Sequence, residues 1–207
     1  MSTDWSGNPF LESWAETSTR MVENAIAANK AAVSAWSVPE TNGDDGGSAD
    51  VPPIDRIEPA EDLPEWHVEM TAEDRSELSV GDRFEFTKTI SEADVRSFAA
   101  ASGDTNPLHL DDEYAQTTRF KGRIAHGTLV GGLISAALAR VPGLVIYLSQ
   151  DLEFHNPVRI DDRITAECEI VEDLGNDQYR LRTQVLNGED TAIDGEAVIL
   201  VDKDPVE

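Results

Sequence analysis

An aspartate and a histidine lie five residues apart in the stretch "SGDTNPLHLD", residues 102–111. Between them stands Asn106-Pro107, a dipeptide that favours a rigid turn. The turn could aim the carboxylate of Asp104 and the imidazole of His109 at one small molecule, as a general acid and base that work near neutral pH. The alternative is a well-capped loop in which Asp104 organises an Asx-turn and His109 is a satisfied loop histidine.

An apolar stretch, "HGTLVGGLISAALAR", spans residues 126–140 and predicts a helix that is buried all round. Gly127 stands where the preceding loop meets this helix, among unpaired backbone N–H groups at the positive end of the helix dipole. Gly131 and Gly132 are poor helix formers and suggest the close approach of another backbone. His126 is interpreted as a structural histidine that bonds locally.

The elements that must position these residues indicate one domain that begins near residue 80. Phe84 and Phe86 alternate with polar residues, as in a half-buried strand. Ser91 and Asp94 resemble a capping box at the start of a short helix. Four strand-like segments end the chain: "GLVIYLSQDLEFHNPV", "RITAECEIVEDLG", "QYRLRTQVLNG" and "DTAIDGEAVILVDK". Turn-like connections such as Asn187-Gly188 favour a meander, so the sequence predicts an α+β domain whose antiparallel sheet wraps around the buried helix.

The chain before this domain has a different character. Residues 9–36 place aromatic and alanine residues on one face of a predicted amphipathic helix. Residues 37–64 are rich in Pro, Gly and Asp, which predicts a flexible acidic linker. The predicted organisation is therefore an N-terminal helix in 1–36, a linker in 37–77 and the domain in 78–207.

The composition restricts the partners. The net charge of −25 argues against binding to nucleic acid or anionic membranes and favours a high-salt cytoplasm, where ions screen the repulsion. An ordinary acidic protein is the alternative. Cys168, the one cysteine, lies in a strand-like segment and is expected in the core. We find no signal-peptide pattern and no apolar segment long enough to span a membrane, so we expect a soluble cytoplasmic protein.

The segment "FAAASGDTNPLHLDDEYAQTTRFKGRIAHGTLV" resembles the motif of the MaoC-like (R)-specific enoyl-CoA hydratases. The resemblance covers roughly residues 78–203 and implies a hot-dog fold. It also implies hydration of trans-2-enoyl-CoA to (R)-3-hydroxyacyl-CoA, which links fatty-acid β-oxidation to polyhydroxyalkanoate synthesis. The substrate carries its own coenzyme A, so neither a cofactor nor a metal is expected.

The resemblance also assigns roles within the site. Asp104 and His109 become the catalytic pair, and the Gly127 N–H becomes the donor to the thioester carbonyl. Ser135 becomes a supporting residue, although a serine on a buried helix often only bonds the carbonyl one turn back. Asn106 is interpreted as a supporting turn residue. His155 is expected at a strand end without a catalytic role.

Binding of coenzyme A to so acidic a protein requires local positive charge. Arg119, Lys121 and Arg123 form the densest basic cluster and are predicted to bind the nucleotide end, unless they are a solvated loop. Hot-dog domains pair edge to edge, so we expect a homodimer. The helix in 9–36 could recruit the enzyme to a polyhydroxyalkanoate granule or a synthase-associated protein, or it could pack on its own domain.

Two other classes of function stay open. One is a different hot-dog thioester enzyme, either a dehydratase of other acyl-CoA esters or a thioesterase. The other is a non-catalytic acyl-CoA-binding scaffold, which would not need the Asp104–His109 pair. The sequence does not indicate the acyl chain length, because no spacing rule identifies the side chains of a tunnel.

Overall fold

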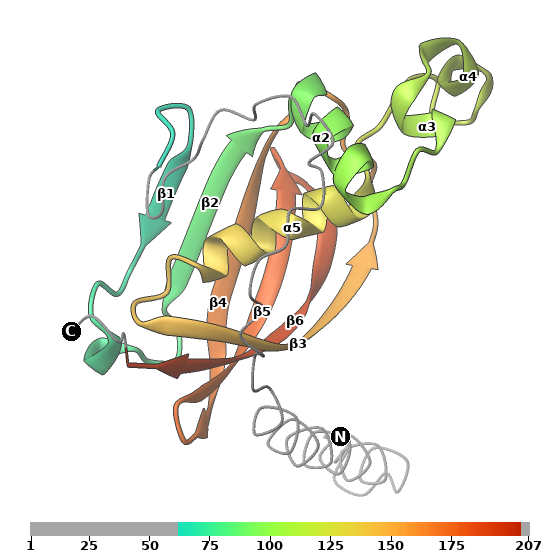
Figure 1. Ribbon diagram of the computed structural model, residues 1–207. Helices are drawn as coiled ribbons and strands as arrows, with labels where there is room; N and C mark the ends of the chain where they lie inside the picture. The colour runs from blue at the N-terminus through green and yellow to red at the C-terminus, as the bar shows by residue number, and fades with distance from the viewer. Residues whose placement is uncertain (1–61, 204–207) are drawn as a thin grey trace, which may run out of the picture. The chain divides into compact units, whose positions relative to one another are not determined.

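A six-stranded antiparallel sheet forms the framework of the computed structural model, which describes residues 62–203. The strand order is β1-β2-β4-β5-β6-β3. Figure 1 shows the sheet curving around one long helix, α5 (Gly127–Leu138). The strands are β1 (His67–Met70), β2 (Arg83–Thr89), β3 (Leu144–Phe154), β4 (Arg163–Gly175), β5 (Gln178–Asn187) and β6 (Asp190–Asp202). The predicted α+β architecture is therefore confirmed.

Two tight turns join the last three strands into a meander. Asn176 and Asp177, both with positive φ, connect β4 to β5, and Gly188 with φ 61° opens the turn into β6. Such backbone angles match the twist of the flanking strands. The predicted four-stranded meander is wrong in one respect: β3 pairs with β6 rather than with β4. β3 therefore becomes an edge strand beside the meander.

Within residues 62–203, three α-helices lie between β2 and α5 and carry the chain to the candidate site: α2 (Glu92–Ser102), α3 (Pro107–Leu110) and α4 (Asp112–Thr117). The predicted capping box of α2 is present, with Ser91 and Asp94 bonding each other's backbone N–H. Burial alone would raise the pKa of Asp94, but hydrogen bonds from Lys88 and Ser91 outweigh it and hold that pKa below its usual value. Gly103, with φ 77°, ends α2 and turns the chain into the Asp104 loop.

The central helix α5 is buried on one face only. Val130, Ile134 and Ala137 are among its buried residues, whereas Gly132 and Ser135 are exposed. The prediction of burial all round is wrong because the sheet covers one side of the helix. The predicted backbone approach at Gly132 is also wrong, since an added Cβ would meet nothing within 4 Å.

The sheet begins earlier in the chain than predicted. β1 pairs with β2, and Trp66 packs edge-on against Phe86 at 5.2 Å between ring centroids. The sequence patterns had placed the domain boundary at residue 78, but this strand lies before it. The predicted N-terminal helix and the linker up to residue 61 lie outside the described residues.

The core agrees with one further expectation. Cys168 is fully buried in β4, and its burial raises the pKa of the thiol, so this side chain acts as core. No helix in residues 62–203 is long and apolar enough to cross a membrane.

Candidate active site

The Asp104 loop is built as an Asx-turn. The Asp104 N–H donates to Ser102 Oγ at 3.2 Å, and Asp104 Oδ1 accepts the Asn106 N–H at 3.2 Å. The capped-loop interpretation is therefore correct for the backbone. Within residues 62–203 no donor reaches Asp104 Oδ2, and the residue is exposed, so this oxygen remains available to a ligand.

His109 is held in the orientation that a base requires. Asn106 caps α3 by accepting the Leu108 N–H at 3.0 Å, and Pro107 occupies the first helical turn. The His109 ring, in a residue only 8% exposed, places Nδ1 2.8 Å from the Ile124 carbonyl oxygen. A carbonyl only accepts, so Nδ1 carries the hydrogen. In the neutral ring Nε2 is then the free acceptor, which can take a proton from water.

Asp104 and His109 meet in space with a third residue, His126. One oxygen or ring nitrogen from each of the three lies within 4.8 Å of the others. A water held by two hydrogen bonds of about 2.8 Å can bridge groups up to roughly 5.6 Å apart. One water can therefore contact both members of the predicted pair.

The same spacing would admit a metal ion by distance alone. The rings of His109 and His126 lie against each other, tilted by 32° with their centroids 3.9 Å apart. His109 Nδ1 and His126 Nε2 each bond a backbone carbonyl, so one ring nitrogen of each histidine remains for a ligand.

His126 is the least exposed polar residue of the site, at 1%. Its Nε2 lies 3.0 Å from the backbone carbonyl of Asp104 and donates to it. The ring of Phe98 also lies near the His126 ring, with 5.0 Å between the two centroids. The expectation of a local bond is wrong, because the partner is 22 residues distant in the chain. His126 joins the aspartate loop to the imidazole of His109.

Gly127 begins α5 immediately after His126. His126 occupies the N-cap position but makes no side-chain capping bond, so it leaves the N–H groups of the first turn without that partner. A Cβ at Gly127 would lie 2.8 Å from Phe154 Cε1. Only glycine therefore leaves space between the N-terminus of the helix and this ring.

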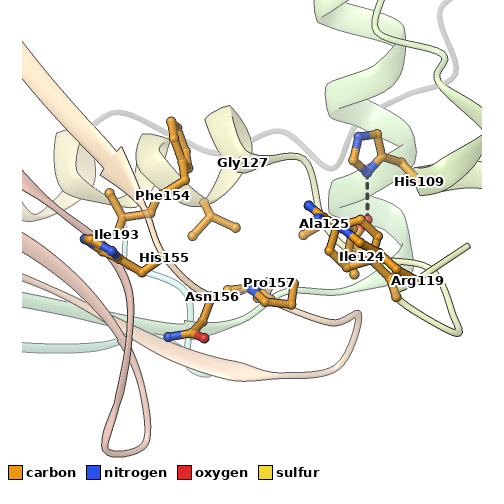
Figure 2. A pocket seen from close by; sticks show the side chains of 13 residues that line it. His109, Arg119, Ile124, Ala125, Gly127, Phe154, His155, Asn156, Pro157 and Ile193 are labelled. Atoms are coloured by element: carbon orange, nitrogen blue, oxygen red, sulfur yellow. Dashed lines mark hydrogen bonds between the residues drawn. The ribbon is translucent and has the colours of Figure 1, made fainter.

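His109 and Gly127 both line a cavity of about 300 Å³. Figure 2 shows Phe154, at the end of β3, along one side of it, together with His155, Asn156 and Pro157, which follow that strand. Val130 and Ile193 add apolar lining. Of these residues the sequence drew attention only to His155, expected at a strand end, and the structure places it there, in the cavity wall. The other lining residues belong to no sequence motif. They come to the cavity because β3 pairs with β6, and local sequence patterns do not reveal that pairing.

Three predicted residues are placed less centrally. Ser135 lies two turns beyond Gly127 on α5, is exposed, and does not line the cavity that contains His109. Arg123 is occupied by carboxylates: it pairs with Glu92 at 2.8 Å and with Asp112 at 2.9 Å. These bonds raise the pKa of Arg123 and lower that of Glu92. Lys121 is exposed on the loop beside the cavity.

Arg119 is the one member of the predicted basic cluster that lines the cavity itself. Its guanidinium lies over the ring of Phe120, at 4.9 Å from the centroid. The structure therefore places His109, Gly127 and Arg119 around one cavity. Asp104 lies beside His109 without lining that cavity, and Ser135 and Arg123 lie outside it.

Known proteins resemble this chain in both sequence and fold. The chain is 43% identical to the (R)-specific enoyl-CoA hydratase of Rhodospirillum rubrum over 128 residues, which are 60% of this chain and 89% of the relative. The structure resembles the unliganded R-hydratase PhaJ1 of Pseudomonas aeruginosa, with a TM-score of 0.60, 46% identity, and coverage of 63% and 86% of the two chains.

A second solved structure is the (R)-hydratase of Aeromonas caviae, described as involved in PHA biosynthesis. It matches with a TM-score of 0.59 and 38% identity over 61% of this chain and 98% of that one. The sheet around α5 is thus the hot-dog fold that the sequence resemblance implied. The family described as MaoC like domain matches residues 76–193, more than half of the chain. The chain belongs to the MaoC-like domain family.

Proposed function

We propose that the protein is an (R)-specific enoyl-CoA hydratase, a hydro-lyase that converts trans-2-enoyl-CoA to (R)-3-hydroxyacyl-CoA. The observation that carries the proposal is the meeting of Asp104 and His109 within the span of one water, with His109 and Gly127 in one cavity. The names of the relatives, (R)-specific enoyl-CoA hydratase and R-hydratase, support it.

Each group has a task in the proposed reaction. Water bound between Asp104 and His109 adds its oxygen to Cβ of the enoyl thioester, and the pair takes its proton and delivers one to Cα. Because the two groups hold the water from different sides, it approaches one face of the double bond, which gives one enantiomer. Negative charge develops on the thioester oxygen, where the Gly127 N–H at the start of α5 can stabilise it.

Hydration of crotonyl-CoA tests the proposal directly. Loss of enoyl absorbance without release of free thiol would identify hydration, whereas thiol release would identify a thioesterase. We expect Asp104→Asn and His109→Gln each to lower kcat by about 10²–10⁴-fold, since each removes a proton-transfer group. Arg182→Gln, on the far strand β5, serves as control. Substantial activity in Asp104→Asn would falsify the role of the pair.

A place in metabolism follows as part of the proposal. An (R)-3-hydroxyacyl-CoA is the monomer that polyhydroxyalkanoate synthesis consumes, and the Aeromonas caviae relative is described as involved in that process. We place the enzyme in the cytoplasm, with recruitment to granules through residues 9–36. Deleting residues 1–60 separates this role from packing on the domain: granule association should be lost while hydratase activity remains.

The proposal also covers the oligomeric state and the salt concentration in which the protein works. The edge strand β3 exposes large apolar side chains, Leu144, Ile146, Tyr147 and Phe154, at 37–56%. Such an edge is suited to pairing with a second copy of itself, so we propose a homodimer. The net charge of −25 supports a working environment of high salt.

A further inference from the structure

A second groove lies along the central helix, apart from the cavity that His109 lines. Its volume is about 400 Å³, and neither His109 nor Gly127 belongs to its walls. One wall comes from α5, and the aromatic part of the lining comes from Trp66, Phe86 of β2 and Phe98 of α2. The lining is almost wholly apolar, and a groove of this volume can hold a small-molecule ligand.

Two hydrogen-bond donors in the lining of this groove lack an acceptor. The indole Nε1 of Trp66 and the Nε of Arg140 are both buried, and within residues 62–203 neither has a hydrogen-bond partner. Phe86 lies beside both groups, with its ring centroid 5.2 Å from the Trp66 ring and 5.6 Å from the Arg140 guanidinium carbon. Buried donors are almost always satisfied in folded proteins. Two unsatisfied donors around one aromatic ring therefore indicate an acceptor that a ligand supplies.

The charge around these donors favours a carboxylate as the acceptor. Arg140 is cationic, and its Nη2 bonds Asp62 while its Nε stays open. Lys88 also lines the groove and is paired with Asp94 at 2.8 Å. An arginine in one ion pair can still bind a second carboxylate, as Arg123 binds two elsewhere in this protein. The planar guanidinium matches a carboxylate, and charged hydrogen bonds of this kind are among the strong ones.

The rest of the groove suits a hydrocarbon chain. Leu129, Leu133 and Ala136 form a stripe along α5 that is about 10 Å long, at 1.5 Å per residue. Gly132 lies within this stripe, and a Cβ there would meet nothing within 4 Å, so the space beside the helix is open. An apolar stripe that leads to the donors of Arg140 fits an unbranched chain that ends in a carboxylate.

We infer that this groove binds a free medium-chain fatty acid, whose carboxylate accepts the Trp66 Nε1–H and the Arg140 Nε–H while its chain lies along α5. The site goes beyond the proposed hydratase function, because its lining includes neither His109 nor Gly127. It also uses a part of the chain outside the MaoC-like match, since Trp66 precedes residues 76–193. Fatty-acid binding and hydration can therefore be tested independently.

Calorimetry on the full-length protein with decanoate and 1-decanol tests the inference. The titration uses about 1 M KCl, where the repulsion between charges is screened. Decanoate should bind with a Kd about tenfold or more below that of 1-decanol, which has the same chain without the carboxylate. Decanoate should also bind in the presence of saturating butyryl-CoA. Equal affinities for the two compounds, or complete displacement by butyryl-CoA, would overturn the site.

Three variants locate the ligand within the groove. Trp66→Phe keeps a ring but removes the donor, and Arg140→Gln removes the charge. Each should weaken decanoate binding about fivefold or more, with a smaller change for 1-decanol. Gly132→Leu should abolish decanoate binding, because the new side chain fills the open space beside α5. Arg180→Gln, which removes a cation paired with Glu172, is the control and should bind decanoate as the parent does. Unaltered affinity in all three variants would reject the inference.

Two other occupants of the groove would give different results. A peptide of residues 9–36 should leave decanoate bound, and Gly132→Leu should leave the sedimentation coefficient unchanged. Displacement of decanoate by the peptide would assign the groove to that segment of the chain, and a smaller sedimentation coefficient would assign it to a second copy. Either result would overturn the fatty-acid site.

Discussion

At the scale of single residues, His126 is the link between the separate parts of the site. Its Nε2–H holds the backbone of Asp104, its ring supports the ring of His109 at 3.9 Å, and the next residue is Gly127. A residue with these three connections sets the distance between the aspartate and the imidazole. We therefore propose that His126 is a positioning residue, since its hydrogen bond and its ring contact are with Asp104 and His109, the proposed catalytic pair.

Two substitutions separate the hydrogen bond of His126 to the Asp104 carbonyl from its ring contact with His109. His126→Gln keeps a side-chain donor for the Asp104 carbonyl but removes the ring, and His126→Phe keeps a ring but removes the donor. We expect kcat to fall about 10–100-fold in both, with KM changed less than threefold, because small displacements of catalytic groups cost rate rather than binding. Because both variants should orient the bound water less firmly, we also expect a lower enantiomeric excess of the 3-hydroxybutyryl-CoA formed. Unchanged kcat with a lower Tm would mean that His126 only stabilises the fold.

The residues that could be predicted from the sequence are those whose partners are local. The Asx-turn at Asp104, which the sequence offered as an alternative, and the turn at Asn106 involve neighbours two residues away. The ion pair of Arg123 joins it to Glu92 across 31 residues, and the His126 bond spans 22. No local spacing encodes such pairs, so Arg123 was predicted to be free for substrate when it is not.

At the scale of elements, the contact between α5 and β3 shapes the cavity. Gly127 at the start of the helix faces the ring of Phe154 at the end of the strand, and an added methyl would approach that ring to 2.8 Å. Phe154 is 56% exposed, so its ring can move aside without unfolding the protein. The cost of a side chain at 127 should therefore appear in the site rather than in the fold.

Gly127→Ala tests this contact. We expect kcat/KM on crotonyl-CoA to fall at least tenfold, because the methyl or the displaced ring occupies space where the thioester carbonyl binds, while Tm changes by only a few degrees. Gly132→Ala is the matched control on the same helix, where a Cβ meets nothing within 4 Å. It should retain activity and raise stability by up to about 1 kcal/mol. Partial recovery in Gly127→Ala/Phe154→Leu would identify the ring as the obstacle, and no recovery would argue against it.

Elements were predicted well where periodicity or a local capping motif defines them. The alternation of Phe84 and Phe86, the capping box at Ser91, and the boundaries of β4 all agree with the structure. The exposed face of α5 and the pairing of β3 with β6 were missed for a common reason. An apolar stretch reveals that a segment can be buried, but not which neighbour covers which face.

At the scale of the whole molecule, the net charge bears on the proposed dimer. Each chain carries −25, so a dimer brings two strongly negative bodies together. The apolar side chains of the β3 edge favour association, and electrostatic repulsion opposes it. The screening length falls from about 10 Å at 0.1 M salt to about 3 Å at 1 M. Salt should therefore strengthen the dimer.

Sedimentation at about 0.1 M and 2 M KCl, with hydratase activity measured in parallel, tests this coupling. We expect a dimer with full activity in high salt, and dissociation with loss of activity after dialysis into low salt. Ile146→Asp should give a monomer even at high salt, because association would bury an unpaired carboxylate among the apolar side chains of the β3 edge, a cost that screening does not remove. Val171→Asp is its control: Val171 is similarly exposed, at 40%, but lies on β4, which β2 and β5 flank. A monomeric parent protein in high salt would reject the dimer, and an active dimer at both salt concentrations would reject the adaptation to salt while leaving the dimer in place.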